Sequence, residues 1–301
     1  MSIFLKRVTR CWRSIFGRMQ RSRINGRIDE VVRTMQVIPS GGALGAEIRG
    51  LNISQALDDD TVRAIRQALL DYCVVYLRDQ DLSEEDQIRF TNYFGRAVEH
   101  VRKQLDRENK EIFIVSNIEE NGQPIGALGD GEVSFHSDLS YLKRPGTISV
   151  LYALEIPSAG GNTQWCNCYA AYEALDEDMK KRLTGLRAVH RHYVEEQNPP
   201  ERVDHPVVRT HPETGRKSLY AGPHLTKYIL DMPTDESDAL LKTLFEHAAR
   251  PEFLWTHVWQ IGDLVMWDNR PTMHRREPFP PSERRMMKRT QVFNADDIPF
   301  E

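Results

Sequence analysis

The sequence predicts a mainly β fold with flanking helices, of the barrel or jelly-roll type. Two observations favour this class. Short apolar runs of strand length recur along the chain and come closest together in its last third. Segments with helical periodicity lie mainly in the first two-thirds, where they can pack against the outside of a barrel. The sequence has neither an internal repeat nor a clear linker, so we expect residues 35–301 to form a single domain.

The first half of this domain is expected to alternate helices with buried strands. Residues 61–72 place apolar side chains on one helical face, after acidic residues that suit the positive end of the helix dipole. A second helix is expected to begin at Ser83, because Asp86 follows three positions later as in a capping box. The expected strands are residues 73–79, 111–118 and 146–157, and a Gly-rich loop is expected at residues 120–132.

The second half is expected to be mostly β. One helix is expected from residue 170 to Gly185, and another over residues 235–250. Residues 205–222 have the pattern of a β-hairpin with its turn at residues 213–215. The remaining expected strands are residues 253–260, 263–269 and 285–293.

The composition excludes several classes of function. The formal net charge is −4, which argues against a general role in binding nucleic acid or a membrane surface. No apolar run approaches the roughly 18 residues of a transmembrane helix, so we expect no integral membrane association. The 4 cysteines are too few and too scattered for a disulfide framework, which favours a reducing, cytoplasmic location. We interpret Cys166 and Cys168 as packing residues, because no second Cys/His pair lies at zinc-site spacing.

Residues 1–34 differ from the rest of the chain. They are rich in Lys and Arg, contain no acidic residue before Asp29, and lack the uninterrupted apolar run of a secretory signal. One interpretation is a basic amphipathic helix that touches a membrane or a partner. The other, which we favour, is a poorly ordered basic extension, translated from a start codon upstream of a native Met35.

Two His-x-acid pairs occur in the sequence, His136/Asp138 and His211/Glu213. Composition alone can produce such pairs, so the spacing by itself decides nothing. The second pair lies at the expected hairpin turn, next to Pro212, where we expect its side chains to face solvent. The first pair lies between the Gly-rich loop and an apolar segment, which makes it the candidate for a functional site.

A metal centre with two imidazoles and one carboxylate on one face leaves positions open for other ligands. On an extended chain, residues i and i+2 point to the same side, so His136 and Asp138 can bind one ion. The third candidate is His274, which follows an apolar strand and a polar turn. Each His taken alone can equally be a surface residue or a hydrogen-bonded core residue.

Arginines follow this third candidate. Arg285 and Arg289 are four residues apart, so on a strand they share a face with Met287. Guanidinium groups beside an apolar strand require anions, because buried charges must be paired. The planar fork of Arg suits a carboxylate.

These motifs together resemble those of the taurine/2,4-D dioxygenase (TauD/TfdA) family of Fe(II)- and 2-oxoglutarate-dependent oxygenases. The resemblance covers residues 35–298. It rests on the HxD motif at 136–138, "GGNTQW" at 160–165, "WDNRPTMH" at 267–274, and an Arg pair eleven and fifteen residues past the last His of that motif. The resemblance implies a double-stranded β-helix, which is a distorted, cupin-like jelly roll, with helices packed outside.

The resemblance also implies a catalytic iron. Fe(II) would be held by His136, Asp138 and His274, which would be both the metal ligands and the catalytic residues. Asp268 and Asn269 would shape the turn that orients His274. The required cofactors would be Fe(II), 2-oxoglutarate as co-substrate, and O2.

By the same resemblance, Thr163 and Arg285 would bind the distal carboxylate of 2-oxoglutarate. Arg289 would face the primary substrate and neutralise an acidic group on it. His100 falls at the position of a substrate-contacting His, and His224 is a further candidate for the same pocket.

The implied function is hydroxylation of a small anionic substrate, a carboxylate or a sulfonate, in some cases with C–O or C–S cleavage. An alternative is a hydroxylase or desaturase of an amino-acid-derived metabolite in a biosynthetic pathway. Two other classes are a non-catalytic binding protein on the same scaffold and a zinc hydrolase. Thr163 and Arg285 discriminate against the hydrolase, which has no need of a 2-oxoglutarate site. We further expect a homo-oligomer, a dimer or a tetramer, that binds no nucleic acid.

Overall fold

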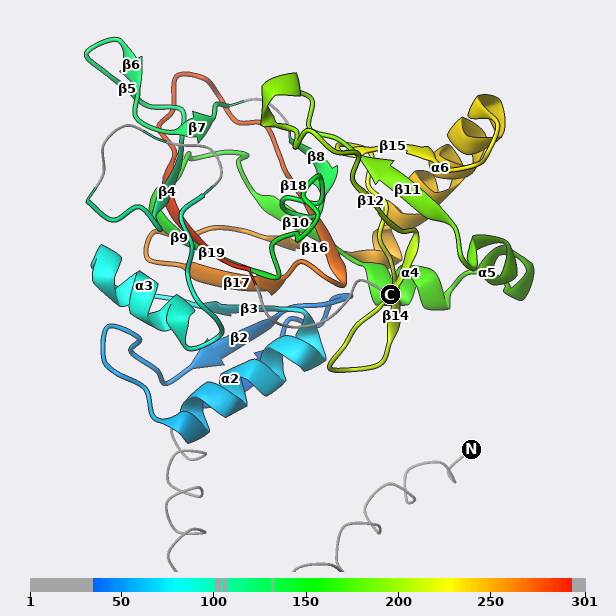
Figure 1. Ribbon diagram of the computed structural model, residues 1–301. Helices are drawn as coiled ribbons and strands as arrows, with labels where there is room; N and C mark the ends of the chain where they lie inside the picture. Colours follow the sequence, from blue (N-terminus) through cyan, green and yellow to red (C-terminus); the bar gives the residue numbers. More distant parts are fainter. Residues whose placement is uncertain (1–34, 101–103, 105–107, 131–132, 294–301) are drawn as a thin grey trace, which may run out of the picture.

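A computed structural model describes residues 35–100, 104, 108–130 and 133–293 of the chain. Two β-sheets face each other and form the centre of the molecule (Figure 1). The predicted mainly β jelly roll with flanking helices is therefore confirmed. The predicted N-terminal extension, residues 1–34, lies outside the described residues.

The larger sheet has eight strands in the order β1-β2-β3-β17-β9-β19-β4-β7. Neighbouring strands are antiparallel, except that β2 pairs with β3, and β4 with β7, in parallel. Its strands are β1 (Gln36–Pro39), β2 (Ala46–Arg49), β3 (Val74–Leu77), β4 (Phe113–Ser116), β7 (Ala127–Leu128), β9 (Ile148–Glu155), β17 (Leu264–Asp268) and β19 (Met286–Val292).

The smaller sheet has four strands in the order β16-β10-β18-β8. They are β16 (Leu254–His257), β10 (Thr163–Asn167), β18 (Thr272–Arg276) and β8 (Val133–His136). In the β18–β8 ladder His274 lies directly opposite His136, so the two imidazoles leave the same face of the sheet. The fold thus brings together two residues that are far apart in the sequence.

The inner faces of the two sheets pack through a buried apolar cluster. Val265 and Trp267 of β17 point inward, where Trp267 meets Trp165 of β10 at 5.5 Å between ring centroids. The alternate residues Leu264 and Met266 point outward toward the helices. Strand periodicity therefore fixes which side chains reach the interior of the jelly roll.

Helices α2 (Asp59–Tyr72) and α3 (Glu84–Asn92) cover the outer face of the larger sheet (Figure 1). Asp58 caps the N-terminus of helix α2, where its side chain accepts a hydrogen bond from the Thr61 backbone N–H. Helix α3 begins with the expected capping box between Ser83 and Asp86. Both predicted helices are confirmed.

The remaining elements extend the smaller sheet on one side. A three-stranded sheet has the order β12-β11-β15, and helices α4, α5 and α6 pack around it (Figure 1). Their bounds are α4 (Cys168–Glu173), α5 (Glu177–Leu183), β11 (Arg187–His190), β12 (Asp204–Pro206), β13 (Val208–Thr210), β14 (Lys217–Leu219), β15 (Thr226–Ile229) and α6 (Thr234–Ala248). Two short strands, β5 (Glu119–Glu120) and β6 (Gln123–Pro124), and two 3-10 turns, Glu195–Gln197 and Pro251–Phe253, complete the described elements.

Two predictions about local structure are wrong. The single helix expected up to Gly185 is two helices, because Asp176 caps a new helix by accepting from the Met179 backbone N–H. The Gly-rich loop at 120–132 carries short strands. His274 follows the strand β17 and a turn, as predicted, and it lies on a further strand, β18, that the sequence did not indicate.

The predicted exposure of His211 is also wrong. The hairpin of β13 and β14 forms, but His211 is buried and its Nε2 lies 3.0 Å from Oδ2 of Asp268. Its Nδ1 accepts hydrogen bonds from the backbone N–H groups of Glu213 and Thr214. The turn therefore folds the imidazole inward, where it anchors the hairpin to the end of β17.

The interpretation of Cys166 and Cys168 as packing residues is confirmed, since both are buried in the apolar cluster under α4 and α6. No helix within the described ranges is both long enough and apolar enough to cross a membrane.

Candidate metal centre and active site

His136, Asp138 and His274 converge on one point. One ligand atom from each lies within 4.8 Å of the other two, a spacing at which the group could hold a metal ion. Oδ1 of Asp138 is 3.6 Å from Nε2 of His136 and 3.8 Å from Nε2 of His274. His136 ends β8, Asp138 follows two residues later, and His274 lies on the adjacent strand β18.

Buried hydrogen bonds fix the carboxylate of Asp138. Oδ2 accepts from the Ser149 hydroxyl at 2.7 Å and from Nε2 of Gln291 at 2.9 Å. Oδ1 is turned toward the two imidazoles and toward Nη1 of Arg289, which is 3.4 Å away. Burial opposes ionisation of Asp138, but the charge of Arg289 and the nearby imidazoles hold its pKa well below the usual range. The charged Oδ1 of Asp138 therefore faces the point on which the three side chains converge.

The two imidazoles are suited to bind a metal through Nε2. His136 donates from Nδ1 to the Ser134 carbonyl at 2.8 Å, which leaves the Nε2 lone pair free. Burial lowers the pKa of His274 to about 3, and the neighbouring His136 adds to this effect, so its imidazole is neutral. Neutral imidazoles and an ionised carboxylate are the forms that bind divalent metals. Two His and one carboxylate with open positions suit non-haem Fe(II), so the residues present fit an iron centre.

The turn before β18 contacts the same centre. Oδ1 of Asn269 accepts hydrogen bonds from Nε1 of Trp267 and from the backbone N–H of Asp138. The adjacent Asp268 forms a buried ion pair with Arg270, at 2.6 Å between Oδ2 and Nη2. The turn therefore joins the end of β17 both to Asp138, just past the end of β8, and to the start of β18.

Thr163 and Arg285 carry polar groups with unused hydrogen-bonding capacity. Oγ1 of Thr163 accepts from Nε1 of Trp259 at 3.0 Å, so its own O–H can donate to another acceptor. Arg285 is 2% exposed, and among the described residues its Nε and Nη1 have no hydrogen-bond partner. Burial, together with the charge of Arg276, lowers the pKa of Arg285 to about 9. A buried guanidinium with unused donors requires an anion.

The Gly-rich motif before Thr163 allows close packing at this place. Gly161 has φ +66°, in the left-handed region that glycine adopts without strain. A Cβ at this position would lie 2.9 Å from Cγ of Pro157 and 3.4 Å from Cδ of Arg285. The motif therefore lets the strand start close to the Arg285 side chain.

The other predicted site residues line one pocket beside the three converging ligands. The pocket, together with its opening to solvent, has a volume of about 440 Å³, and Arg289, His100 and His224 all line it. Nη2 of Arg289 lies 3.0 Å from Nε2 of His100, whose ring stacks on Phe113 at 4.0 Å between centroids. The ring of His224 is 5.3 Å from that of His136. The fold thus brings all three predicted residues to the same cavity.

Sequence reasoning missed an aromatic wall of this pocket. The rings of Tyr141, His192, Tyr193 and His224 form a continuous series, with centroid separations of 4.9, 4.2 and 5.3 Å. Tyr193 is 57% exposed although its ring contacts two imidazoles. His192 and Tyr193 lie between β11 and β12, and no pattern in that stretch of the sequence indicates that they reach the pocket.

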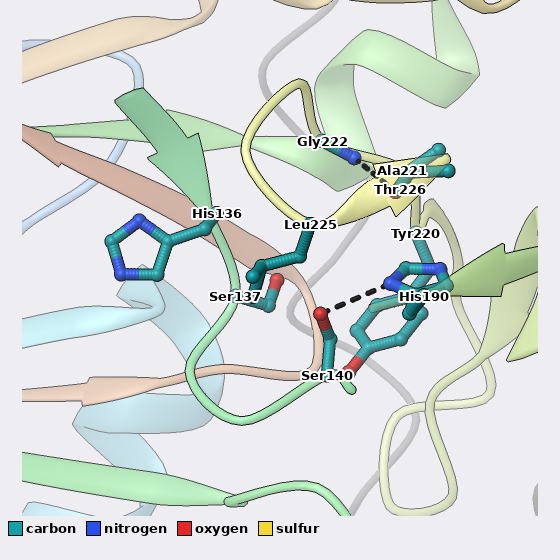
Figure 2. A pocket seen from close by; sticks show the side chains of 9 residues that line it. All are labelled: His136, Ser137, Ser140, His190, Tyr220, Ala221, Gly222, Leu225 and Thr226. Carbon is teal, nitrogen blue, oxygen red and sulfur yellow. Dashed lines mark hydrogen bonds between the residues drawn. The ribbon is translucent and has the colours of Figure 1, made fainter. Parts of the chain in front are cut away.

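A second, smaller pocket lies behind His136 (Figure 2). On its far side Nδ1 of His190 lies 3.0 Å from the Ser140 hydroxyl, and Tyr220 stacks on the same imidazole at 5.7 Å. Burial lowers the pKa of His190 to about 3, and the neighbouring His205 adds to this effect, so His190 is neutral. These contacts hold the segment that follows the HxD motif in place.

Comparisons with known proteins find relatives that match most of the chain. The family model "Taurine catabolism dioxygenase TauD, TfdA family" matches residues 36–291. Pentalenolactone F synthase of Streptomyces arenae is 34% identical over 88% of this chain and 97% of its own length. Alpha-ketoglutarate-dependent 2,4-dichlorophenoxyacetate dioxygenase of a Burkholderia species is 34% identical, covering 81% of this chain and 89% of its own.

An alkylsulfatase of Acinetobacter baylyi is also 34% identical, over 82% of this chain and 81% of its own length. Among solved structures, AAD-2 in complex with Mn(II) and N-oxalylglycine superposes with a TM-score of 0.77 at 31% identity. That match covers 89% of this chain and 99% of the other. The resemblance seen in the sequence motifs is therefore confirmed over almost all of the described residues.

Proposed function

Because this chain belongs to the TauD, TfdA family of dioxygenases, we propose that His136, Asp138 and His274 hold its catalytic iron. The chain is an Fe(II)- and 2-oxoglutarate-dependent dioxygenase that acts on a small anionic substrate. The observation that carries the assignment of the site is the convergence of these three ligand atoms within 4.8 Å. When bound, Fe(II) and 2-oxoglutarate together activate O2 and oxidise a C–H bond of the substrate.

The protein prepares this site before the cofactors bind. Ser149 and Gln291 hold Oδ2 of Asp138, so that Oδ1 remains for the metal. Together with Nε2 of His136 and of His274 it would supply three ligands to the ion, which would leave coordination positions for the co-substrate and O2. Because both imidazoles are already aimed and the carboxylate is already ionised, binding needs little reorganisation.

Thr163 and Arg285 bind the distal carboxylate of 2-oxoglutarate in this proposal. The unused Nε and Nη1 donors of Arg285 suit a two-point contact to a carboxylate. Trp259 donates to the oxygen of Thr163 and so directs the Thr163 proton toward the same anion. The two side chains fix one end of the co-substrate while the other end reaches the metal.

Arg289 and His100 receive the anionic group of the primary substrate. Both line the pocket beside Asp138, and stacking on Phe113 keeps the imidazole of His100 in place. Arg289 also lies against Oδ1 of Asp138, at 3.4 Å from its Nη1, which places the bound anion close to the metal. A C–H bond near that anionic group is therefore held next to the reacting centre.

The wall of the pocket favours an apolar body for this substrate. Four aliphatic residues and the aromatic series line it, namely Leu128, Val133, Leu139, Leu225, Tyr141, His192, Tyr193 and His224. Among the described lining residues, Asp138 is the only acidic one, and in this proposal it is bound to iron. Among these described residues an ammonium group would find no carboxylate other than that of Asp138. This supports a carboxylate or sulfur oxyanion without an amino group, and argues against an amino-acid-derived substrate.

The relatives' names agree with such a substrate. They include a 2,4-dichlorophenoxyacetate dioxygenase and an alkylsulfatase, whose substrates join an anion to an apolar body. Hydroxylation at the carbon that bears an ether or ester oxygen gives an unstable product, which then breaks at the C–O bond. We propose the same outcome for this enzyme wherever its substrate carries such an oxygen.

The expected cytoplasmic location and homo-oligomeric state, a dimer or a tetramer, remain part of the proposal. The three free, buried cysteines among the described residues are consistent with a reducing compartment. Light scattering of the purified full-length chain measures the oligomeric state directly.

Product analysis by mass spectrometry tests the proposed substrate class. The Fe(II)-loaded enzyme is incubated with 2-oxoglutarate and a panel of aryloxyacetates, arylpropionates, alkyl sulfates, alkylsulfonates and amino acids. We expect oxygenated or cleaved products from amine-free anions that carry an apolar body. Products from the amino acids alone would overturn the substrate class.

A further inference from the structure

We propose that Arg276 is a second cationic residue of the 2-oxoglutarate pocket, which with Arg285 makes that pocket selective for an oxo acid with two carboxylates. The proposal rests on the proposed function, since it concerns the co-substrate site. Arg276 lies two residues past His274 on β18, and neither the sequence motifs nor the family resemblance singled it out.

The strand register places Arg276 beside Thr163. In the β10–β18 ladder Thr163 is directly opposite Arg276, and Trp165 is directly opposite His274. Side chains directly opposite each other on antiparallel strands leave the same face. Trp165 and His274 stack inside the jelly roll at 6.3 Å between ring centroids, so Thr163 and Arg276 point to that interior as well.

Arg276 is held firmly in this position. It is 7% exposed, its Nη1 donates to the Gly129 carbonyl at 2.9 Å, and its guanidinium lies 5.3 Å from the ring centroid of Phe279. Gly160, at the start of the same Gly-rich motif, packs against the Pro278–Phe279 backbone. The motif that precedes Thr163 thus contacts the segment on which Arg276 packs.

The charge of Arg276 acts on Arg285. Burial is the main reason that the pKa of Arg285 falls to about 9, and Arg276 is the neighbouring charge that lowers it further. The carboxylate of Asp130 offsets part of the charge of Arg276, whereas no acidic neighbour among the described residues acts on Arg285. Repulsion between the two guanidiniums therefore falls mainly on Arg285, and it costs stability unless an anion reaches that side chain. A distal carboxylate on Thr163 and Arg285 removes this cost, and an oxo acid without that carboxylate does not.

The two cations therefore act as a charge filter for the co-substrate. 2-Oxoglutarate carries one carboxylate to the metal and one to the Arg285 end. A monocarboxylate such as 2-oxobutanoate fills only the metal end and leaves the unused Nε and Nη1 donors of Arg285 without a carboxylate. Arg285 supplies the direct contact, and Arg276 increases the preference for the dianion through its field.

A purely structural role for Arg276, holding the Gly129 loop, predicts something different. Loss of that hydrogen bond would loosen the pocket and weaken both kinds of oxo acid alike. The ratio of the affinity for the dianion to that for the monoanion therefore distinguishes the two roles. It falls on loss of Arg276 if Arg276 selects by charge, and it stays the same if Arg276 only supports the Gly129 loop.

Anaerobic titration calorimetry on the Mn(II)-loaded full-length protein tests the proposal without turnover. The probes are N-oxalylglycine, which is dianionic, and 2-oxobutanoate, which is monoanionic. In Arg276→Gln we expect the Kd of N-oxalylglycine to rise roughly 10-fold or more, while that of 2-oxobutanoate stays the same or falls. Arg276→Lys should keep most of the preference.

Arg284→Gln is the matched control, because it also removes one positive charge close by but from an exposed residue paired with Glu155. It should leave both affinities unchanged. If Arg276→Gln fails to fold, Arg276→Met, which keeps the apolar stem, takes its place. An unchanged affinity ratio, or equal weakening of both acids, would overturn the role of Arg276. Failure of the wild-type protein to bind N-oxalylglycine would instead overturn the proposed function.

Discussion

Replacing Arg285 by Met should remove co-substrate binding without destabilising the protein. Arg285 is 2% exposed and has two N–H groups with no partner among the described residues, so the free protein bears the cost of a buried charge. Met fills a similar volume and carries no charge. The same substitution deletes the group that binds the distal carboxylate, so stability and binding should change in opposite directions.

The magnitude follows from the two donors. Each charge-assisted hydrogen bond to a carboxylate contributes about 1.5–3 kcal/mol, so the loss of two weakens 2-oxoglutarate binding by about 100-fold or more. A ligand at 100 times its Kd stabilises the folded state by about 2.7 kcal/mol. In a domain of this size that corresponds to a rise in Tm of about 5 °C.

Thermal unfolding of the Mn(II)-loaded protein, measured with and without 2-oxoglutarate, reports both the stability of the unliganded protein and the binding of 2-oxoglutarate. We expect a ligand-dependent Tm rise in the wild type and in the control Arg284→Met, and none in Arg285→Met. The unliganded Tm of Arg285→Met should equal or exceed that of the wild type. A retained ligand shift, or a large drop in the unliganded Tm, would refute the assignment of Arg285 as an anion site.

Three other predictions concern the metal, the substrate wall and the fold. His136→Ala should abolish stoichiometric Fe(II) binding, measured by metal analysis after desalting, and a full complement of iron would contradict the ligand assignment. Tyr193→Ala should lower kcat/KM for aromatic anions by roughly 10-fold while sparing short alkyl anions, since it removes one face of the aromatic wall. Although burial opposes ionisation of Asp268, Arg270 and His211 stabilise its charged form and lower its pKa in the folded state. The ionised Asp268 therefore stabilises the fold above about pH 4, and this stabilisation is lost as the pH falls toward the lower folded-state pKa. Asp268→Asn should lower the free energy of unfolding by about 3–5 kcal/mol at pH 7, measured by denaturant unfolding, and should weaken the fall of stability at acidic pH. An unchanged fall of stability at acidic pH would show that another group causes it.

The sequence predicted the site better than it predicted the connections between elements. His136 and Asp138 could be found because the i, i+2 spacing of a strand applies to a short local stretch. His274 and Arg285 could be predicted because the motifs that contain or precede them resemble those of the family to which the chain belongs. Applying the same i, i+2 rule to His274 would have indicated Arg276, had β18 been recognised as a strand.

The errors arose where tertiary contacts outweigh local signals. A Pro-Glu-Thr-Gly turn ordinarily faces solvent, but His211 is drawn inward by Asp268, 57 residues further along the chain. Tyr193 reaches the pocket because the loop after β11 packs against His224, which precedes β15. Neither contact leaves a pattern in the local sequence, so both become apparent only in the folded structure.

Release of succinate from 2-oxoglutarate is the measurement that tests the central claim most directly. The purified Fe(II)-loaded protein is assayed in air, with and without an amine-free aryl carboxylate or alkyl sulfate. The account predicts succinate that increases when a matching anion is added and disappears in Asp138→Ala. Absence of succinate from protein shown to contain iron would contradict the assignment of these residues to a 2-oxoglutarate-dependent dioxygenase centre.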